Sequence, residues 1–408
     1  MNCQNYRSIS LLNTTYKVLS NIILNRLKPY AKEIVVEYQV GFTAGKSTTD
    51  QIHVIKQITE KSHEFDKDVY LLFVDFKQAY DSIARSTLWN VMVQLGIPAK
   101  LVRMVKACMK NSRCKVKFNS VLSKEFTVTT GVRQGDALSP ILFNIALESV
   151  VKEVLQNEPQ GLNIGQGKQV LLAAYADDIV VIAETVDSLK RTTDILIDAA
   201  KKIRFIINKN KTKFMIVSRR KLPQNALTVK DLSFERVRNF KYLGVEINSQ
   251  GHSHEEIHRR IAAGNKFYFS LVQLFKSKIL SRKIKIRLYK KVLQRIFGPE
   301  RNDEGSYEIR SNRELNALYN ESNIVSTFKS QRIRWAGHVW RAEGQLISII
   351  TKWKPDKSRP RGRPRQRWED RVKEDLRMLG VRNGEEQAAH REAWKEIAEA
   401  AMGLNDLD

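Results

Sequence analysis

Two apolar runs separated by a short polar segment lie near the middle of the chain. In Leu171–Glu184, LLAAYADDIVVIAE, Asp177 and Asp178 lie between runs that each have the length of a buried strand. Because aspartate favours tight turns and is poor inside strands, the pattern predicts a hairpin whose turn holds two carboxylates at the edge of a sheet. A second apolar and β-rich run, Val69–Val74, predicts a buried strand that Asp75 closes.

Each acidic feature has a simpler interpretation when it is considered alone. Asp177 and Asp178 are then part of a solvated turn, and Asp75 is the N-cap of the helix that follows it. Placed beside the turn, however, Asp75 completes a carboxylate cluster for two metal ions, and a bound metal is the partner that its buried charge requires. Carboxylate oxygens bind Mg²⁺, which keeps positions free for phosphate and water. Two such ions about 4 Å apart activate a 3′-hydroxyl and stabilise a leaving pyrophosphate.

Helical and strand periods alternate through the rest of the chain. Tyr16–Tyr30 has helical spacing, and Pro29 is expected to end this helix. Glu255–Leu293 has the pattern of a basic amphipathic helix with a break near Ser277–Arg282, for which membrane-surface binding is a competing interpretation. The other predicted helices are Leu88–Met109 with a break near Gly96, Leu138–Leu155 and Asp187–Ile203, and the other predicted strands are Lys115–Phe118, Glu125–Thr129, Phe214–Ser218 and a hairpin over Phe240–Ile247.

Composition narrows the class of protein. The 408 residues are 42% hydrophobic, which argues against wholesale disorder and allows more than one domain. The net charge of +26 favours a polyanionic partner, with nucleic acid as the leading candidate. Cys3, Cys108 and Cys114 form neither a zinc-ligand spacing nor a disulfide framework. No apolar run reaches membrane-span length and no secretory signal opens the chain, so we expect no membrane association and a nuclear or cytoplasmic location.

Three motifs around the carboxylates resemble the central palm motifs of reverse transcriptases, in the order of that family. They read VDFKQAYD, GVRQGDALSPILFNI and YADDIVVIAE. Supporting matches are NYRSISLLNTTYKVLSNIILNRL and QVGFTAGKSTTDQI upstream, and NKNKTKF and FKYLGVEI downstream. The chain resembles in particular the LINE-type (non-LTR) retrotransposon enzymes, and most closely the endonuclease–reverse transcriptase proteins of animal elements.

The resemblance implies a fold and a chemistry. The fold is an α+β right-hand polymerase with a palm sheet, truncated fingers and a helical thumb, followed by a basic helical tail. Asp75, Asp177 and Asp178 are the implied ligands of two Mg²⁺ ions, for which Mn²⁺ substitutes. Lys211, in the pattern NxxKTK, is the implied general acid that protonates pyrophosphate, although the neighbouring lysines cannot be ranked by sequence.

Further residues are implied to contact the nucleotide or the template. Tyr80 matches the aromatic residue that selects deoxynucleotides, with a core tyrosine as the alternative. Gln134 and Gly135 match the dipeptide that positions template and nucleotide. Arg133 is placed for phosphate binding, but arginines in loops are more often solvated. Lys46 partly replaces the basic residues of the family loop, with a solvated lysine as the alternative.

Several departures from the family pattern put activity in question. Thr43 replaces the loop arginine that contacts nucleotide phosphates, Ser8 replaces a proline, and the thumb looks shortened near position 293. The predicted function is RNA-directed DNA polymerisation with an RNA template, a DNA primer and dNTPs as partners. A catalytically dead remnant that only binds nucleic acid is the alternative, and an RNA-dependent RNA polymerase is a weaker third. No endonuclease part is expected before the polymerase, which leaves room for an endonuclease acting in trans.

The predicted domains are residues 1–250 (fingers and palm), 251–293 (thumb) and 294–408 (basic helical module). The last domain contains an Arg- and Pro-rich linker over 354–367. Arg361, Arg363 and Arg365 in this linker are candidate nucleic-acid contacts. They resemble the core of an AT-hook, although nonspecific phosphate binding is the simpler interpretation.

Overall fold

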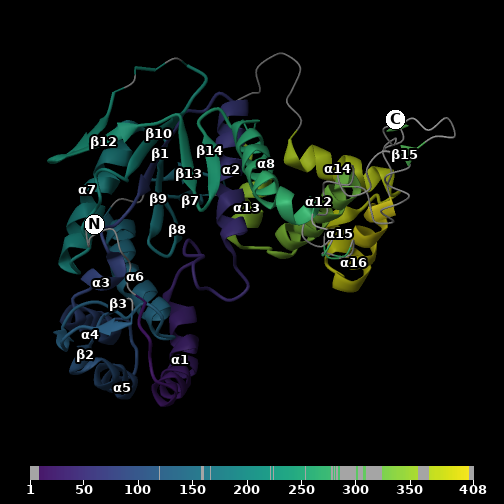
Figure 1. Cartoon of the computed structure of the whole chain (residues 1–408). Helices are drawn as coiled ribbons and strands as arrows, with labels where there is room; N and C mark the ends of the chain where they lie inside the picture. The colour runs from purple at the N-terminus through teal and green to yellow at the C-terminus, as the bar shows by residue number, and fades with distance from the viewer. Residues whose placement is uncertain are drawn as a thin grey trace. The chain divides into compact units, whose positions relative to one another are not determined.

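The computed structural model divides the chain into two compact units (Figure 1). The first unit is Met1–His252 with Gln345–Arg361, and the second is Ser253–Gly344 with Gly362–Asp408. The structure describes residues 9–118, 120–157, 160–165, 167–220, 222–223, 225–252, 254–276, 279, 281, 284, 300–301, 307–308, 324–356 and 367–403.

A six-stranded sheet forms the centre of the first unit. The strand order is β11-β12-β10-β1-β9-β8, and β1 pairs antiparallel with both β9 and β10. Leu72 lies opposite Val181 on one side and Phe214 on the other. The predicted strands over Val69–Val74 and Phe214–Ser218 and the central hairpin are therefore confirmed, whereas β11 and β12 were not predicted. The strands are β1 (Val69–Val74), β8 (Leu172–Tyr175), β9 (Asp178–Ala183), β10 (Lys213–Val217), β11 (Leu227–Val229) and β12 (Leu232–Arg236).

Helices cover both faces of this sheet because β1 is apolar on both of its faces. Leu72 and Val74 belong to the core built with α6 (Ser139–Asn157) and α7 (Val186–Lys202). On the opposite face, the Phe73 ring stacks on Phe240 with centroids 4.4 Å apart. That face carries α2 (Thr48–Glu64) and the hairpin of β13 (Asn239–Tyr242) and β14 (Val245–Asn248), and Figure 1 shows α2 and α7 on opposite sides of the sheet.

The first helix differs from its prediction. α1 spans Thr14–Ile34 and continues through Pro29, which we expected to end it. Proline removes one backbone donor, but the acceptor it leaves is on exposed Asn25 and is accessible to water. Ala31 and Ile34 beyond the proline are buried, so packing continues to support the helix.

Short helices and hairpins complete the first unit. The predicted break near Gly96 is confirmed, and its φ of 83° is the left-handed conformation that glycine adopts readily. The remaining helices are α3 (Ala79–Ser82), α4 (Arg85–Gln94) and α5 (Ala99–Met109). The small hairpins pair β2 (Ser112–Cys114) with β5 (Phe126–Val128), β3 (Lys117–Phe118) with β4 (Val121–Leu122), and β6 (Leu162–Asn163) with β7 (Gln169–Val170).

One segment from the predicted C-terminal module belongs to the first unit. The helix α13 (Leu346–Lys352) packs on α2, where the buried Lys61 ammonium donates hydrogen bonds to the carbonyls of Ile350 at 2.9 Å and Trp353 at 2.7 Å. The boundary therefore differs from the one that composition suggested. A buried lysine that satisfies the last carbonyls of a helix is a long-range contact that sequence patterns do not reveal.

The second unit is helical. The helix α12 (Ile324–Arg341) forms its core with Trp394, whose indole N–H donates to the Ile333 carbonyl at 2.9 Å. Gly337 permits this contact, because a Cβ there would lie 2.1 Å from Nε1 of Trp394. The other elements are α8 (His254–Lys276), α14 (Trp368–Met378), α15 (Gly384–Ala388), α16 (Arg391–Ala400), η2 (Ala401–Gly403), β15 (Glu300–Arg301) and β16 (Tyr307–Glu308). Among the helices described in either unit, none has the length and apolar character that a bilayer span requires.

Candidate active site

A cleft of about 1320 Å³ opens in the first unit at the end of β1. Its walls come from α1, the residues that follow β1, the loop over 134–140, the β8–β9 turn and the segment over 208–211. Segments far apart in sequence thus meet at one edge of the central sheet.

Asp177 and Asp178 lie in the wall of this cleft. Tyr175 pairs with Asp178 across the hairpin, so Ala176 and Asp177 form a two-residue turn between β8 and β9. The prediction that the carboxylate pair lies at or beside a tight hairpin turn is confirmed, since Asp177 is in the turn and Asp178 is the first residue of β9. Ala176 has a φ of 53°, the left-handed conformation that favours glycine, and this turn is therefore strained.

Asp75 follows β1 directly and lies beside the turn in the sheet register. Val74 is paired with Ile179, and extending this register by one residue brings Asp75 opposite Asp178. The Asp75 N–H donates to Oγ1 of Thr212 at 3.2 Å, while its side-chain Oδ2 is buried without a hydrogen bond. The alternative that Asp75 caps the next helix is wrong, because the N-cap of α3 is Gln78.

The three predicted metal ligands are not gathered into one group. Within the described ranges, no set of three or more His, Cys, Asp or Glu side chains is arranged to hold a metal ion. Asp177 and Asp178 share the cleft wall, and Asp75 contributes a buried oxygen without a hydrogen bond at the neighbouring strand end.

Tyr80 reaches the cleft from α3. Its ring stacks on Phe143 with centroids 4.5 Å apart, so one face belongs to the core. Burial, followed by the nearby Asp177 carboxylate, raises the pKa of the Tyr80 hydroxyl and keeps it protonated. Tyr80 is therefore both a packed side chain and part of the cleft wall, which unites the two interpretations of the sequence.

Lys211 also lines the cleft. It lies in a turn in which its N–H donates to the Asn208 carbonyl at 3.1 Å, and the Asn208 N–H in turn donates to the Asp75 carbonyl at 2.8 Å. Lys213 is instead part of β10 and forms an ion pair with Glu235 at 2.6 Å. The structure thus separates lysines that the sequence left unranked. Lys17 and Lys77, which sequence reasoning missed, also line the cleft.

Gln134 and Gly135 lie in the cleft wall, as the resemblance implied. The Gln134 carbonyl accepts the N–H of Ser10 at 2.8 Å. Gly135 has a φ of 101°, and a Cβ there would lie 3.0 Å from the Ser10 carbonyl oxygen. This backbone conformation and close approach require glycine at position 135.

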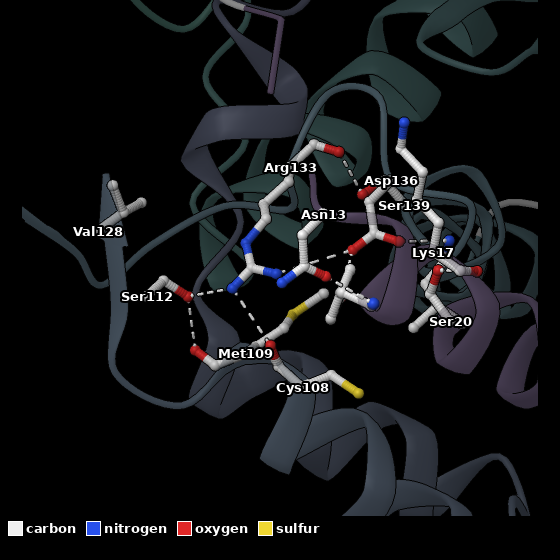
Figure 2. A network of polar contacts seen from close by, with 12 residues as sticks. Asn13, Lys17, Ser20, Cys108, Met109, Ser112, Val128, Arg133, Asp136 and Ser139 are labelled. Carbon is white, nitrogen blue, oxygen red and sulfur yellow. Dashed lines mark hydrogen bonds and ion pairs between the residues drawn. The ribbon is translucent and has the colours of Figure 1, made fainter. Parts of the chain in front are cut away.

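Arg133 extends into a polar network (Figure 2) and is not among the residues that line the cleft. Its guanidinium donates to Oγ of Ser112 at 2.8 Å and to the Cys108 carbonyl at 3.2 Å, and lies 5.2 Å from the Tyr16 ring centroid. The Tyr16 hydroxyl donates to Asp136 at 2.5 Å, and burial together with that bond raises the pKa of Tyr16. Arg133 therefore anchors the loop that precedes Gln134.

Comparison with known proteins identifies the family. Residues 2–247 match the family described as reverse transcriptase (RNA-dependent DNA polymerase). The chain belongs to the reverse transcriptase family. Its mixed helix-and-sheet fold agrees with the α+β palm that the sequence predicted.

Similar proteins come from mobile elements. A probable RNA-directed DNA polymerase from transposon X-element of Drosophila melanogaster is 28% identical over 71% of this chain and 32% of its own length. The RNA-directed DNA polymerase from mobile element jockey of Drosophila funebris is 27% identical over 60% of this chain and 27% of its own length. The 149 kDa protein of transposon TX1 of Xenopus laevis is 27% identical over 60% of this chain and 19% of its own length. This reverse transcriptase chain thus spans a third or less of these relatives.

A solved structure extends the comparison. Telomerase from Candida tropicalis, in complex with a fragment of telomeric RNA, is 14% identical with a TM-score of 0.41 and covers 96% of this chain and 56% of its own.

Lys46 of this reverse transcriptase lies outside the cleft wall. Its Nζ donates to the Glu37 carbonyl at 3.1 Å, and burial lowers its pKa. The aromatic Phe42, in the same loop, lines the cleft instead. Arg361, Arg363 and Arg365, the predicted contacts of the tail, fall outside the described residues.

Gln39 is a site residue that sequence reasoning missed. It is buried, and its Oε1 accepts the N–H groups of Gly41 and Ala176, each at 2.8 Å. Its Nε2 donates to the Ala176 carbonyl at 3.3 Å. The only signal in the sequence was the position of Gln39 at the start of a glycine-punctuated motif, since its partner lies 137 residues away.

Proposed function

We propose that this chain is an RNA-directed DNA polymerase that adds dNTPs to a primer 3′-hydroxyl. The observation that carries the proposal is the meeting of Asp177 and Asp178 with Lys211 and Tyr80 in one cleft, at the strand end that Asp75 closes. The family membership and the mobile-element relatives support the same reaction.

The residues present fit divalent metal ions in part. A carboxylate oxygen that is buried without a hydrogen bond is costly, and a hard cation would satisfy Oδ2 of Asp75. We propose Asp75, Asp177 and Asp178 as the residues that hold two Mg²⁺ ions, or Mn²⁺ in their place. When bound, the ions would supply charge stabilisation for the attacking hydroxyl and the leaving pyrophosphate.

The other cleft residues have separate proposed roles. Lys211 is the proposed proton donor to the leaving pyrophosphate. The Tyr80 ring, held by Phe143, is the proposed barrier to a ribose 2′-hydroxyl. Gln134 and Gly135 offer an amide and close backbone approach to the nascent base pair. Lys17 and Lys77 add positive charge for phosphates.

The proposed partners are an RNA template, a DNA primer and dNTPs, with an endonuclease acting in trans. A heteroduplex would be bound chiefly through its backbone and A-like shape. The excess of lysine and arginine supports phosphate binding, and Arg361, Arg363 and Arg365 are proposed to add to it. Such substrates agree with a nuclear or cytoplasmic location.

A second candidate function is nucleic-acid binding without catalysis. It is favoured by Thr43 at the position of the family arginine. The two candidates differ in nucleotide incorporation and agree in substrate binding.

Primer extension on poly(rA)/oligo(dT) with Mg²⁺ distinguishes them. The Asp177→Ala variant is expected to lose incorporation and to keep substrate binding, which fluorescence anisotropy measures. Asp231→Ala is the matched control, because Lys230 and Asp231 form a two-residue turn between paired Val229 and Leu232 and Lys230 has a φ of 49°. Equal incorporation by wild type and Asp177→Ala would sink the assignment, and binding without incorporation by wild type would favour the second candidate.

A further inference from the structure

We propose that Gln39 is the positioning residue that holds the Asp177 and Asp178 turn in its working geometry. The inference rests on the proposed function, since it assigns Gln39 a part in that reaction. Gln39 reaches no substrate from its buried position and acts through the backbone of Ala176.

The Gln39 side-chain amide is hydrogen-bonded to both backbone polar groups of Ala176. Its Oε1 accepts the Ala176 N–H at 2.8 Å, and its Nε2 donates to the Ala176 carbonyl at 3.3 Å. Ala176 is the residue between Tyr175 and Asp177, so these bonds act on the turn itself. A hydrogen-bond acceptor and a donor in one rigid amide plane define both the position and the orientation of the turn.

The turn has a particular need for such support. Ala176 adopts a φ of 53°, which an alanine rarely adopts, and such conformations persist only where the surroundings over-determine them. Ala176 is buried, so water cannot replace the bonds from Gln39. Without the amide, the turn would be free to relax toward a conformation that moves the two carboxylates.

Gln39 is itself held in place from several sides. The Val40 N–H donates to the Ala174 carbonyl, and the Ala174 N–H donates to the Tyr38 carbonyl, each at 2.9 Å, so the segment pairs with β8. Nδ2 of Asn144 on α6 donates to the Gly41 carbonyl at 2.8 Å. We call the two hydrogen bonds from Gln39 to Ala176 the Gln39 clamp. This clamp connects the turn to β8 and to a helix of the core.

Catalytic geometry is sensitive to small displacements, and a misplacement of about 1 Å can lower a rate by about 10²-fold. Gln39→Met keeps the length of the side chain and removes both the acceptor and the donor. We expect this variant to lose at least about tenfold in kcat for dTTP incorporation, while the KM for dTTP changes by less than about threefold, because the nucleotide contacts lie elsewhere in the cleft.

Gln57→Met is the matched control. Gln57 is similarly buried, on α2, and donates to Glu60 at 3.0 Å rather than to the turn. Its extension kinetics are expected to equal those of wild type. An equal loss of kcat in both variants, or unchanged kcat in Gln39→Met, would overturn the inference.

Hydrogen exchange adds a measurement that requires no variant. The Ala176 amide bonds to a side chain rather than to a strand, yet in wild type it is expected to exchange as slowly as the amides of β8. Fast exchange of the Ala176 amide in wild type would overturn the inference that Gln39 holds the turn. In Gln39→Met, the amides of Ala176 and Gly41, which both donate to Oε1 of Gln39, should become fast while the amides of β1 stay protected. If wild type itself fails to extend primers, the proposed function fails; if wild type extends and Gln39→Met does so equally, only the present inference fails.

Discussion

Replacing Gly41 by alanine tests the packing of the candidate active site where the Gln39–Gly41 segment meets the turn. A Cβ at position 41 would lie 2.3 Å from the Ala176 nitrogen, 3.0 Å from the Tyr175 carbonyl carbon and 3.0 Å from Oε1 of Gln39. The two neighbours in the turn are backbone atoms, and the Gln39 amide is held by its own hydrogen bonds, so none of the three can move aside easily. Gly41 does not adopt a positive φ, and the contact is therefore the only cost of the substitution.

The magnitude follows from these distances. Side-chain Cβ atoms essentially never approach closer than 3.0 Å, so the first separation must grow by about 0.7 Å. Overpacking of this kind costs about 1–3 kcal/mol of the free energy of unfolding. That is a fraction of the roughly 5–15 kcal/mol typical of a folded domain, so the protein should remain folded. A displacement of the turn approaching about 1 Å should lower the rate of incorporation by about 10²-fold.

The assay combines urea denaturation with single-turnover primer extension. Gly45→Ala is the control in the same loop: no atom lies within 4 Å of its added Cβ, although its φ of 79° makes alanine strained. We therefore expect Gly45→Ala to lose roughly 1–2 kcal/mol of stability and little activity. Wild-type turnover by a folded Gly41→Ala variant would refute the argument that this contact sets the geometry of the turn.

Two further predictions concern stability. Lys61→Met should lower the free energy of unfolding of the first unit by about 2–4 kcal/mol, because it leaves the carbonyls of Ile350 and Trp353 buried without their donor; chemical denaturation measures this, and a change below about 0.5 kcal/mol would contradict it. Burial raises the pKa of Glu148, so the folded state holds this proton to higher pH than the unfolded state, and the stability this group contributes falls as pH rises above the usual glutamate range. Glu148→Gln, which can still accept from Tyr38, should therefore gain stability relative to wild type between pH 4 and pH 8, and a difference independent of pH would show that ionisation of Glu148 is not responsible.

Sequence patterns located the carboxylates because the signal is local. An apolar run that ends in aspartate defines a strand end, and two such runs around Asp177 and Asp178 define a hairpin turn. The register of β1 with β9 then follows from burial of both apolar strands, which brings Asp75 beside the turn. The family motifs supplied the roles of these residues, which periodicity alone could not.

The sequence predictions that differ from the structure mostly concern contacts between distant parts of the chain. The rule that proline ends a helix predicted that the first helix would end at Pro29. The helix α1 continues beyond it because Ala31 and Ile34 are buried. The sequence shows Arg133 only as a positively charged residue in a loop. The fold brings Ser112 and the Tyr16 ring within reach of its guanidinium. Lys46 differs, because its hydrogen bond to the Glu37 carbonyl is local in the sequence.

Sequence patterns and motifs were sufficient to predict the family, the strands β1, β8, β9 and β10 of the palm sheet, and the hairpin turn beside the two carboxylates, but not β11 and β12. Only the tertiary structure decided that Lys211 reaches the cleft, that Gln39 clamps the turn and that α13 joins the first unit through Lys61. The physical reason is that strand ends and turns depend on neighbouring residues, whereas buried hydrogen bonds depend on which distant groups the fold brings within reach.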